Sequence, residues 1–272
     1  MSTRRAAEGF EAHHSERFGP RWPILKAALL EEGKKFQLEN PFWQEGSSLE
    51  RFYHLDPASV RAADALPLVE GGRHLDLCAA PGGKALTAIF RAPTGMSFIL
   101  NDSSRDRVKR LKAVLHDFLP PEKLSQVRVT NHVGERWGLH EQEAYDSVLV
   151  DAPCSGERHL LKTPAELKIW SPNRSKGLAQ RQFALLCSAL ETVKVGGHIL
   201  YSTCSIESLE NDLVIRRLLE RRAGRVEVVK EPEIFKRDLV ELAPEKTDYG
   251  AILLPDRSAG GPIYYCLLKR LS

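Results

Sequence analysis

From His74 onward, short apolar runs of strand length alternate with longer stretches of helical periodicity. The runs that predict strands are 74–80, 96–102, 126–131, 145–153 and 196–204. Helical stretches accompany them at 85–92, 105–119, 177–193 and 209–224. Strands separated by helices form βαβ units, which build a parallel sheet with helices on both faces. The sequence therefore predicts an α/β fold of the Rossmann-like, doubly wound kind.

Three later apolar runs, 226–230, 251–256 and 262–271, predict further strands. Little sequence separates the last two, whereas a parallel pair needs a long crossover connection. We therefore expect a mostly parallel sheet with an antiparallel final strand.

The N-terminal region has a different pattern. Its apolar residues recur at helical spacing, at Phe10, Phe18, Trp22, Leu25, Leu29 and Leu30. An aromatic, loop-like stretch follows, and 57–69 is again helical in pattern. We expect residues 1–50 to form a small helical extension and residues 51–272 to form the main domain.

Composition narrows the functional classes. The chain has 272 residues, a formal net charge of +3 and five widely spaced cysteines without a CxxC pair. This argues against a disulfide framework or a zinc site, so we expect no metal and a reducing compartment, with the cytoplasm as the default. No apolar run has the length of a membrane span, and the acidic N-terminus lacks the apolar core of a secretory signal. A mildly basic charge is compatible with a polyanionic partner.

The stretch LDLCAAPGGK, residues 75–84, connects the first strand of the alternating region to its helix. Ligands of open α/β sheets lie beyond the carboxyl ends of the strands, where this turn falls. Gly82 and Gly83 permit close approach of the backbone, the helix N-terminus favours an anionic group, and Lys84 adds a positive charge. The turn matches neither GxGxxG nor a Walker A loop, which argues against NAD and ATP. A merely structural tight turn is the alternative.

The next strand ends at Asp102, where a doubly wound fold usually places the acid that binds ribose hydroxyls. A ribose-binding acid, a glycine-containing turn and a helix N-terminus together favour S-adenosylmethionine as the cofactor. Alternatively Asp102 caps the following helix, although Ser103 or Ser104 would serve equally well.

Two cysteines lie in polar turns at strand ends, Cys154 in PCSG and Cys204 in TCSIE. If their strands are neighbours, both thiols face the cleft of the cofactor. A helix that starts nearby lowers the pKa of a thiol and makes the thiolate available. Inert burial is the simpler reading for Cys78, Cys187 and Cys266, whose neighbours are mainly apolar.

A methyl donor beside a thiolate suits methylation of a pyrimidine at C5. Thiolate attack at C6 makes C5 nucleophilic, and after methylation a proton and the thiolate must both leave. A second cysteine can take part in that release. Asp151 is placed to bind the N3/N4 edge of cytosine, which favours the attack at C6.

The motifs LDLCAAPGGK, VDAPCSG and YSTCSIESLEN resemble those of the Sun family (Nol/Nop/Sun, also called Fmu) of RNA 5-methylcytosine methyltransferases. YHLDPASVRAADAL, DSSRDRVKRL and GPIYYCLLKRL extend the resemblance over nearly the whole chain, in particular to the compact mitochondrial members. The resemblance implies a class I S-adenosylmethionine-dependent methyltransferase fold, with residues 51–272 as the catalytic domain.

The resemblance also implies residue roles. Cys204 would be the nucleophile, Cys154 would assist product release, and Asp151 would orient the base. The residues that would hold the cofactor are Cys78, Ala79, Pro81, Gly82, Gly83, Lys84, Asp102, Arg107 and Asp151. Glu210 and Asn211 would shape the loop after the second cysteine.

One position departs from the family. Val133 aligns where the family usually has an acid near the adenine amino group. Either Asn131 or His132 replaces that hydrogen bond, or the adenine is held by backbone and apolar contacts.

The expected substrate is an unpaired or flipped-out cytosine in rRNA or tRNA, because a base inside a helix cannot reach such a cleft. Candidate RNA contacts are Arg158, His159, Lys162, Lys168 and Trp170, with Arg4, Arg5 and Arg21 in the N-terminal extension. The basic stretch 215–225 is either a further contact or a solvated helix face. We expect a monomer, with recognition aided by the extension, a protein partner or a ribosomal particle.

Two other functions compete with RNA methylation. One is an RNA-binding or ribosome assembly factor that keeps the fold with weak activity, which only Val133 favours. The other is a methyltransferase acting on DNA or a small molecule, which leaves the second cysteine unexplained.

Overall fold

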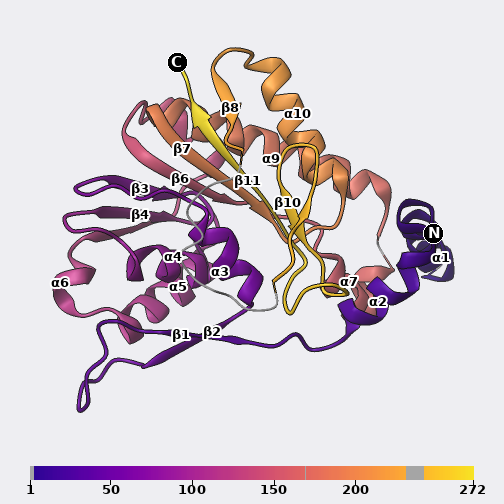
Figure 1. Ribbon diagram of the computed structural model, residues 1–272, viewed down its shortest axis with the longest axis horizontal. Helices are drawn as coiled ribbons and strands as arrows, with labels where there is room; N and C mark the ends of the chain where they lie inside the picture. Colours follow the sequence, from indigo (N-terminus) through magenta and orange to yellow (C-terminus); the bar gives the residue numbers. More distant parts are fainter. Residues whose placement is uncertain (1–2, 169, 231–241) are drawn as a thin grey trace.

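The computed structural model describes residues 3–168, 170–230 and 242–272, and a nine-stranded mixed sheet forms its centre (Figure 1). The spatial order is β5-β4-β3-β6-β7-β11-β10-β9, with β8 paired to β11. Its strands are β3 (Arg73–Asp76), β4 (Ser97–Asn101), β5 (Val127–Thr130), β6 (Tyr145–Asp151), β7 (Val193–Thr203), β8 (Val226–Val228), β9 (Glu245–Lys246), β10 (Ala251–Leu253) and β11 (Ile263–Arg270). Strands β3 to β7 are parallel and β11 is antiparallel to β7. Both predictions about the sheet are confirmed.

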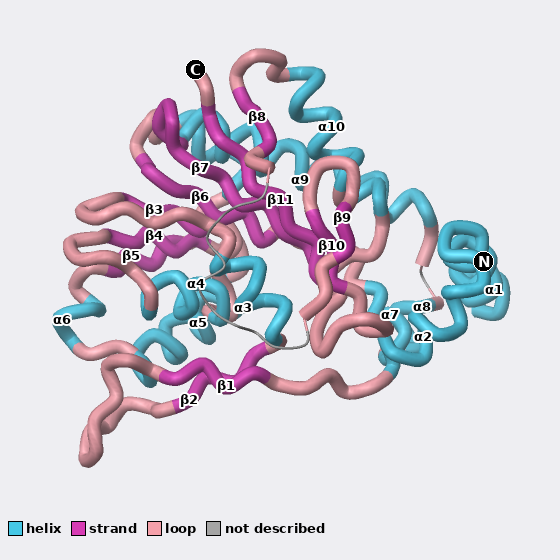
Figure 2. Tube along the Cα trace, viewed as in Figure 1, coloured by secondary structure: helices cyan, strands magenta, loops and turns pink. Residues whose placement is uncertain are grey.

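Helices connect the parallel strands. They are α3 (Pro57–Asp64), α4 (Gly83–Phe90), α5 (Arg105–Phe118), α6 (Pro121–Leu124), η2 (Gly134–Leu139), α7 (Glu157–Lys162), α8 (Pro164–Leu167), α9 (Pro172–Thr192), η3 (Ser208–Glu210) and α10 (Asp212–Arg221). Figure 2 shows α3, α4 and α5 on one side of the sheet, with α9 and α10 on the other. The order 3-2-1-4-5 of the parallel strands, followed by an antiparallel strand, is a class I methyltransferase arrangement.

Alternate residues of the central strands enter two different cores. Val148 and its sheet neighbour Ile199 pack with the apolar side chains of α9 and α10. Leu149 and its neighbour Leu200 pack on the opposite face with α3. Strands buried on both faces are nearly continuous in hydrophobicity, which explains why these two runs were recognisable in the sequence.

The N-terminal region is helical only as far as Leu30. It consists of α1 (Thr3–Phe18), η1 (Gly19–Arg21) and α2 (Trp22–Leu30), followed by an antiparallel hairpin of β1 (Phe36–Glu39) and β2 (Phe52–Leu55). The predicted boundary between residues 50 and 51 falls inside this hairpin. The stretch had appeared loop-like because its strands have only four residues each.

The basic stretch 215–225 lies largely on α10. Arg225 forms an ion pair with Glu191, and the Arg217 guanidinium lies over the Phe183 ring, 4.1 Å from its centroid. These contacts favour the structural reading of that stretch. None of the helices in the described part of the chain combines the length and the apolar composition that a membrane crossing requires.

Candidate active site

The polar residues singled out in the sequence meet at the carboxyl ends of the parallel strands. Asp76 ends β3, Asp102 directly follows β4, Asp151 ends β6, and Cys204 directly follows β7. Because β3 lies between β4 and β6, and β6 lies beside β7, these ends form one edge. Ligands of open α/β sheets bind at this edge.

The two predicted cysteines are in contact. The Sγ atoms of Cys154 and Cys204 lie 2.6 Å apart, and the backbone N–H of Cys204 also donates to Sγ of Cys154, at 3.2 Å. The hydrogen bond to Cys204, followed by burial, raises the pKa of the Cys154 thiol well above its ordinary value. Cys154 therefore keeps its proton and acts as the donor, while the exposed Cys204 is the sulfur that a substrate can reach.

Two buried carboxylates brace the loops that carry these thiols. Glu157 accepts hydrogen bonds from the backbone N–H of Ile206 and from the hydroxyls of Ser155 and Ser205. Glu210 accepts from the backbone N–H of Ser155 at 3.0 Å. The loop of one cysteine is thus bound to the loop of the other, which keeps the sulfurs together.

The role expected for Glu210 and Asn211 in shaping the second loop agrees with this geometry. The side-chain amide of Asn211 accepts from the Thr203 hydroxyl and donates to the Ser205 carbonyl. Sequence reasoning missed Glu157, because a glutamate at the start of a short helix gives no sign of burial by itself.

Asp151 is held from two sides. One carboxylate oxygen accepts from Lys84 Nζ and the other from the Ser202 hydroxyl, both at 2.8 Å. Burial opposes the charge on Lys84, but the Asp151 carboxylate outweighs it and raises the pKa of the lysine. The lysine of the first turn therefore ties that turn to the strand that leads to Cys154, and Asp151 stays partly exposed beside the thiols.

The first turn requires its glycine. Gly82 has φ +125°, a conformation that side chains rarely adopt, and a Cβ there would lie 3.1 Å from Val114 on α5. Gly83 begins α4, whose free N–H groups point toward the strand ends. Cys78, Ala79 and Pro81 lie on the segment between β3 and this helix, and burial, followed by the charge of Asp76, raises the pKa of the Cys78 thiol.

Asp102 fits a ribose contact better than a helix cap. Ser104 is the N-cap of α5, where its hydroxyl accepts from the backbone N–H of Arg107. One oxygen of Asp102 accepts from the backbone of Ser104, and the other is buried without a hydrogen bond among the described residues. That oxygen lies 3.1 Å from the Arg107 guanidinium, which also donates to the Ala80 carbonyl. Arg107 covers Asp102, so a ribose hydroxyl reaches the acid once this side chain moves.

Asp76 is a further acid at this edge that sequence reasoning did not single out. One oxygen accepts from the backbone N–H of Cys78, and the other has no hydrogen bond within the described residues. Burial, together with the nearby Asp151 charge, raises the pKa of Asp76 to about 8. Asp76 is therefore largely protonated at neutral pH, and it can donate a hydrogen bond.

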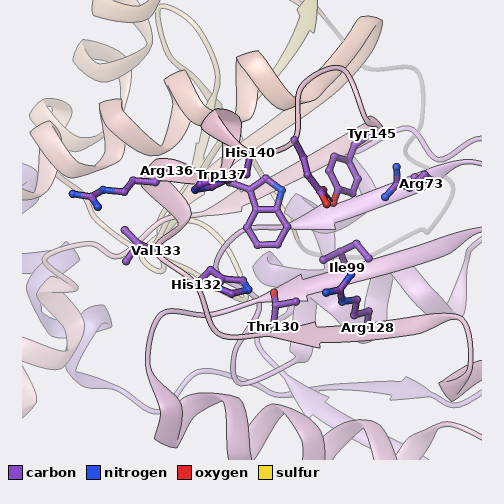
Figure 3. Close-up of a pocket in the computed structure, with 11 residues that line it drawn as sticks. Arg73, Ile99, Arg128, Thr130, His132, Val133, Arg136, Trp137, His140 and Tyr145 are labelled. Atoms are coloured by element: carbon purple, nitrogen blue, oxygen red, sulfur yellow. Dashed lines mark hydrogen bonds between the residues drawn. The ribbon is translucent and has the colours of Figure 1, made fainter.

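Val133 lies where the family acid was expected, and its side chain is 54% exposed. It lines a groove of about 370 Å³ that extends under η2 along β5 and β4 (Figure 3). Asn131 donates to the backbone of Asp102, and the His132 ring faces Trp137. The His132 side chain therefore remains as the polar group beside Val133 in this groove.

Three of the five candidate RNA contacts are exposed beside the cysteines. His159, Lys162 and Lys168 belong to the segment of α7 and α8 that follows Cys154. A Cβ on Gly156 would lie 3.7 Å from Cys204 Sγ and 3.9 Å from His159 Cβ, which places His159 near the nucleophile. Arg158 is less available, because it lies 3.5 Å from the Asp56 carboxylate.

The prediction that Trp170 stacks on RNA is wrong for this structure. Its side chain is buried, with the rings of Phe10 and His13 at centroid distances of 5.3 and 5.6 Å. Arg21 is also engaged, by Glu245 and Asp256. The aromatic ring attaches helix α1 to the domain, a role that local sequence cannot distinguish from nucleic-acid stacking.

Comparison with known proteins identifies similar chains. Residues 63–269 match the family model described as 16S rRNA methyltransferase RsmB/F. The Mus musculus protein named 5-cytosine rRNA methyltransferase NSUN4 is 37% identical over 232 residues, which cover 81% of this chain and 60% of that protein. The Danio rerio mitochondrial tRNA (cytosine(34)-C(5))-methyltransferase is 35% identical, over 82% of this chain and 62% of that protein. The chain therefore spans less than two thirds of the length of these relatives.

Solved structures share the fold. A methyltransferase homolog protein from Pyrococcus horikoshii superimposes with a TM-score of 0.67 and 20% identity, over 93% of this chain and 92% of that chain. NSun6 from the same organism gives 0.64 and 20%, over 86% and 57%. These similarities agree with the class I methyltransferase arrangement of the sheet, for which S-adenosylmethionine is the cofactor.

Proposed function

Because this chain belongs to the 16S rRNA methyltransferase RsmB/F family, we propose that it methylates C5 of a cytosine in RNA through a covalent adduct on Cys204. One observation carries the proposal: the sulfurs of Cys154 and Cys204 lie 2.6 Å apart at the edge of the sheet that holds the cofactor turn. Two thiols in contact provide one sulfur to attack the base and a second to help release it.

Cys204 acts as the nucleophile. Its sulfur is exposed, and the neighbouring Cys154 keeps its proton and stabilises a Cys204 thiolate by donation. The thiolate attacks C6 of the cytosine, and the electron pair of the C5–C6 double bond moves to C5. Asp151, partly exposed beside the thiols, accepts a hydrogen bond from the N3/N4 edge, which favours this shift.

S-adenosylmethionine, when bound, provides the electrophilic methyl group that C5 takes up. The first turn and α4 hold its methionine part through backbone N–H groups at Gly82 and Gly83. Asp102 binds the ribose, and the protonated Asp76 donates a hydrogen bond toward the cofactor or a bridging water. Lys84 keeps this turn in register with Asp151.

Cys154 assists release. Once Cys204 is bound to carbon, its negative charge is lost and the Cys154 proton can pass to solvent. The Cys154 thiolate then takes the C5 proton, the electron pair re-forms the C5–C6 bond, and Cys204 leaves as a thiolate. Its neighbour again carries a proton, which restores the starting state of the pair.

The substrate we propose is a single-stranded or flipped-out cytosine in rRNA or tRNA. The exposed His159, Lys162 and Lys168 contact the RNA beside the target base, and charge attraction to the phosphates attracts the strand. We propose a monomeric enzyme in the cytoplasm, because thiolate chemistry needs reduced cysteines. A protein partner or a ribosomal particle completes RNA recognition.

The test uses wild type, Cys154→Ala and Cys204→Ala, each incubated with unmodified total RNA and S-adenosylmethionine and run on a denaturing gel. We expect a slow, RNase-sensitive band with Cys154→Ala, because the adduct forms but is not released. No such band should form with Cys204→Ala. A band only with Cys204→Ala would reverse the two roles. Absence of both adduct and methyl transfer, with ribosomal particles supplied, would favour the RNA-binding or assembly factor.

A further inference from the structure

A group of metal-ligating side chains lies outside the proposed active site, where α1 meets the loop after Cys204. It consists of His13, His14 and Glu207, whose ligand atoms all lie within 4.8 Å of one another. Nε2 of His13 is 2.8 Å from Oε1 of Glu207, and Nδ1 of His14 is 3.5 Å from the same oxygen. Ligand atoms around a tetrahedral Zn²⁺ are separated by about 3.3 Å, given its bond lengths of about 2.0–2.1 Å.

His14 is the group that most needs an explanation. Its side chain is 0% exposed, and neither ring nitrogen has a hydrogen-bond partner in the described part of the chain. Buried polar groups without partners are rare and costly in native proteins. Burial, followed by the neighbouring His13 and Arg17, lowers the pKa of His14 to about 3, so the ring is neutral and able to ligate a metal.

The remaining members suit the same role. Glu207 is 3% exposed and provides a carboxylate that would otherwise be a buried charge. His13 is 32% exposed, which gives an ion a path from solvent. Two imidazoles and one carboxylate are a common donor set for Zn²⁺, which takes a water molecule as its fourth ligand.

Arg17 is the group that opposes a cation here, since its guanidinium lies 3.2 Å from Oε2 of Glu207. The side chain also lines a pocket of about 170 Å³ that contains Asp212. Arg17 can therefore turn toward Asp212 when a metal takes over the charge of Glu207. In the absence of metal it neutralises the same carboxylate.

We propose that His13, His14 and Glu207 form a binding site for Zn²⁺ that ties helix α1 to the loop after Cys204. Only three positions separate Glu207 from the nucleophile, so an occupied site fixes the orientation of that loop. The cysteine pattern of the sequence predicted no metal site, and this one uses no cysteine.

The test is calorimetric titration of Zn²⁺ into the full chain carrying Cys154→Ser and Cys204→Ser, which removes the other pair of groups able to hold zinc. We expect one equivalent to bind, and His14→Phe to weaken binding at least about tenfold. Phenylalanine preserves the ring stack on Trp22, so the variant should fold. Zn²⁺ at a hundredfold excess over its Kd should also raise Tm by roughly 5 to 10 °C.

Matched variants separate this site from nonspecific binding. His13→Gln and Glu207→Gln should weaken binding as His14→Phe does, whereas His116→Gln, at an exposed position of α5, should leave it unchanged. They also replace His14→Phe should that variant not fold. The proposal is overturned if the chain binds no Zn²⁺ at micromolar concentration, or if binding survives both His13→Gln and Glu207→Gln. Neither outcome depends on methyl transfer.

Discussion

The sulfurs of Cys154 and Cys204 lie 2.6 Å apart although 50 positions separate the two residues. Parallel pairing of β6 with β7 brings their carboxyl ends together, and the buried Glu157 binds both following loops. A thiol pair this close has an oxidation chemistry as well as a catalytic one.

We predict that a mild thiol oxidant such as diamide converts this pair into an intramolecular disulfide. Each sulfur loses one hydrogen and the oxidant gains both, and the sulfurs need to move only slightly to bond. Thiol titration should find three reactive groups instead of five under denaturing conditions, and methyl transfer should stop until a reductant is added. Cys187→Ser should leave the effect intact, and retention of all five thiols in wild type would contradict the prediction.

The raised pKa of Asp76 predicts a pH dependence of stability. An unfolded Asp ionises near its ordinary pKa of 3.8, whereas the buried one holds its proton to about pH 8. Between these values the native state binds the extra proton, so this group lowers the free energy of unfolding as pH rises, by up to about 1.4 kcal/mol per unit. Asp76→Asn should flatten the decline measured by urea unfolding between about pH 5 and pH 8. Asp106→Asn, at an exposed position on α5, should not.

Trp170 and Lys168 should behave oppositely. Trp170→Ala should destabilise the chain by about 3–5 kcal/mol, because it removes a buried ring that packs on α1. Lys168→Ala should change stability by less than about 0.5 kcal/mol, yet weaken RNA binding and its dependence on salt. Urea unfolding and filter binding at several salt concentrations measure the two effects. Normal stability of Trp170→Ala with impaired RNA binding would return the ring to the RNA surface.

Gly82→Ala should destabilise the chain by about 1–3 kcal/mol. The added Cβ enters a strained φ of +125° and approaches Val114 to 3.1 Å. Gly224→Ala is the matched control, because it has φ +75° with nothing within 4 Å of the added carbon. Urea unfolding should show the smaller loss for Gly224→Ala. Equal losses would mean that contact with α5 does not matter.

The alternating pattern of the sequence predicted the central sheet because strands β6 and β7 are buried on both faces. Their adjacency, on which the meeting of Cys154 with Cys204 depended, is confirmed by the pairing of Asp151 with Ser202. The hairpin β1–β2 was not predictable in the same way. Its short strands have one face open to solvent and no long apolar run.

The supporting groups of the site were also beyond the sequence. Glu157 and Asp76 have the composition of ordinary surface acids, and only tertiary packing buries them. Trp170 shows the reverse error, since an aromatic residue near lysines matches a nucleic-acid pattern until α1 covers it. Properties set by contacts distant in sequence cannot be derived from local spacing.

The position of β11 has a consequence for how the chain is made. This strand, Ile263–Arg270, is an interior strand of the sheet, between β7 on one side and β8 and β10 on the other. During synthesis β7 emerges long before its partner, so one side of the strand that leads to Cys204 stays unpaired. An open edge of this kind invites pairing with other chains, and a chaperone or the ribosome surface must shield it until the last residues emerge.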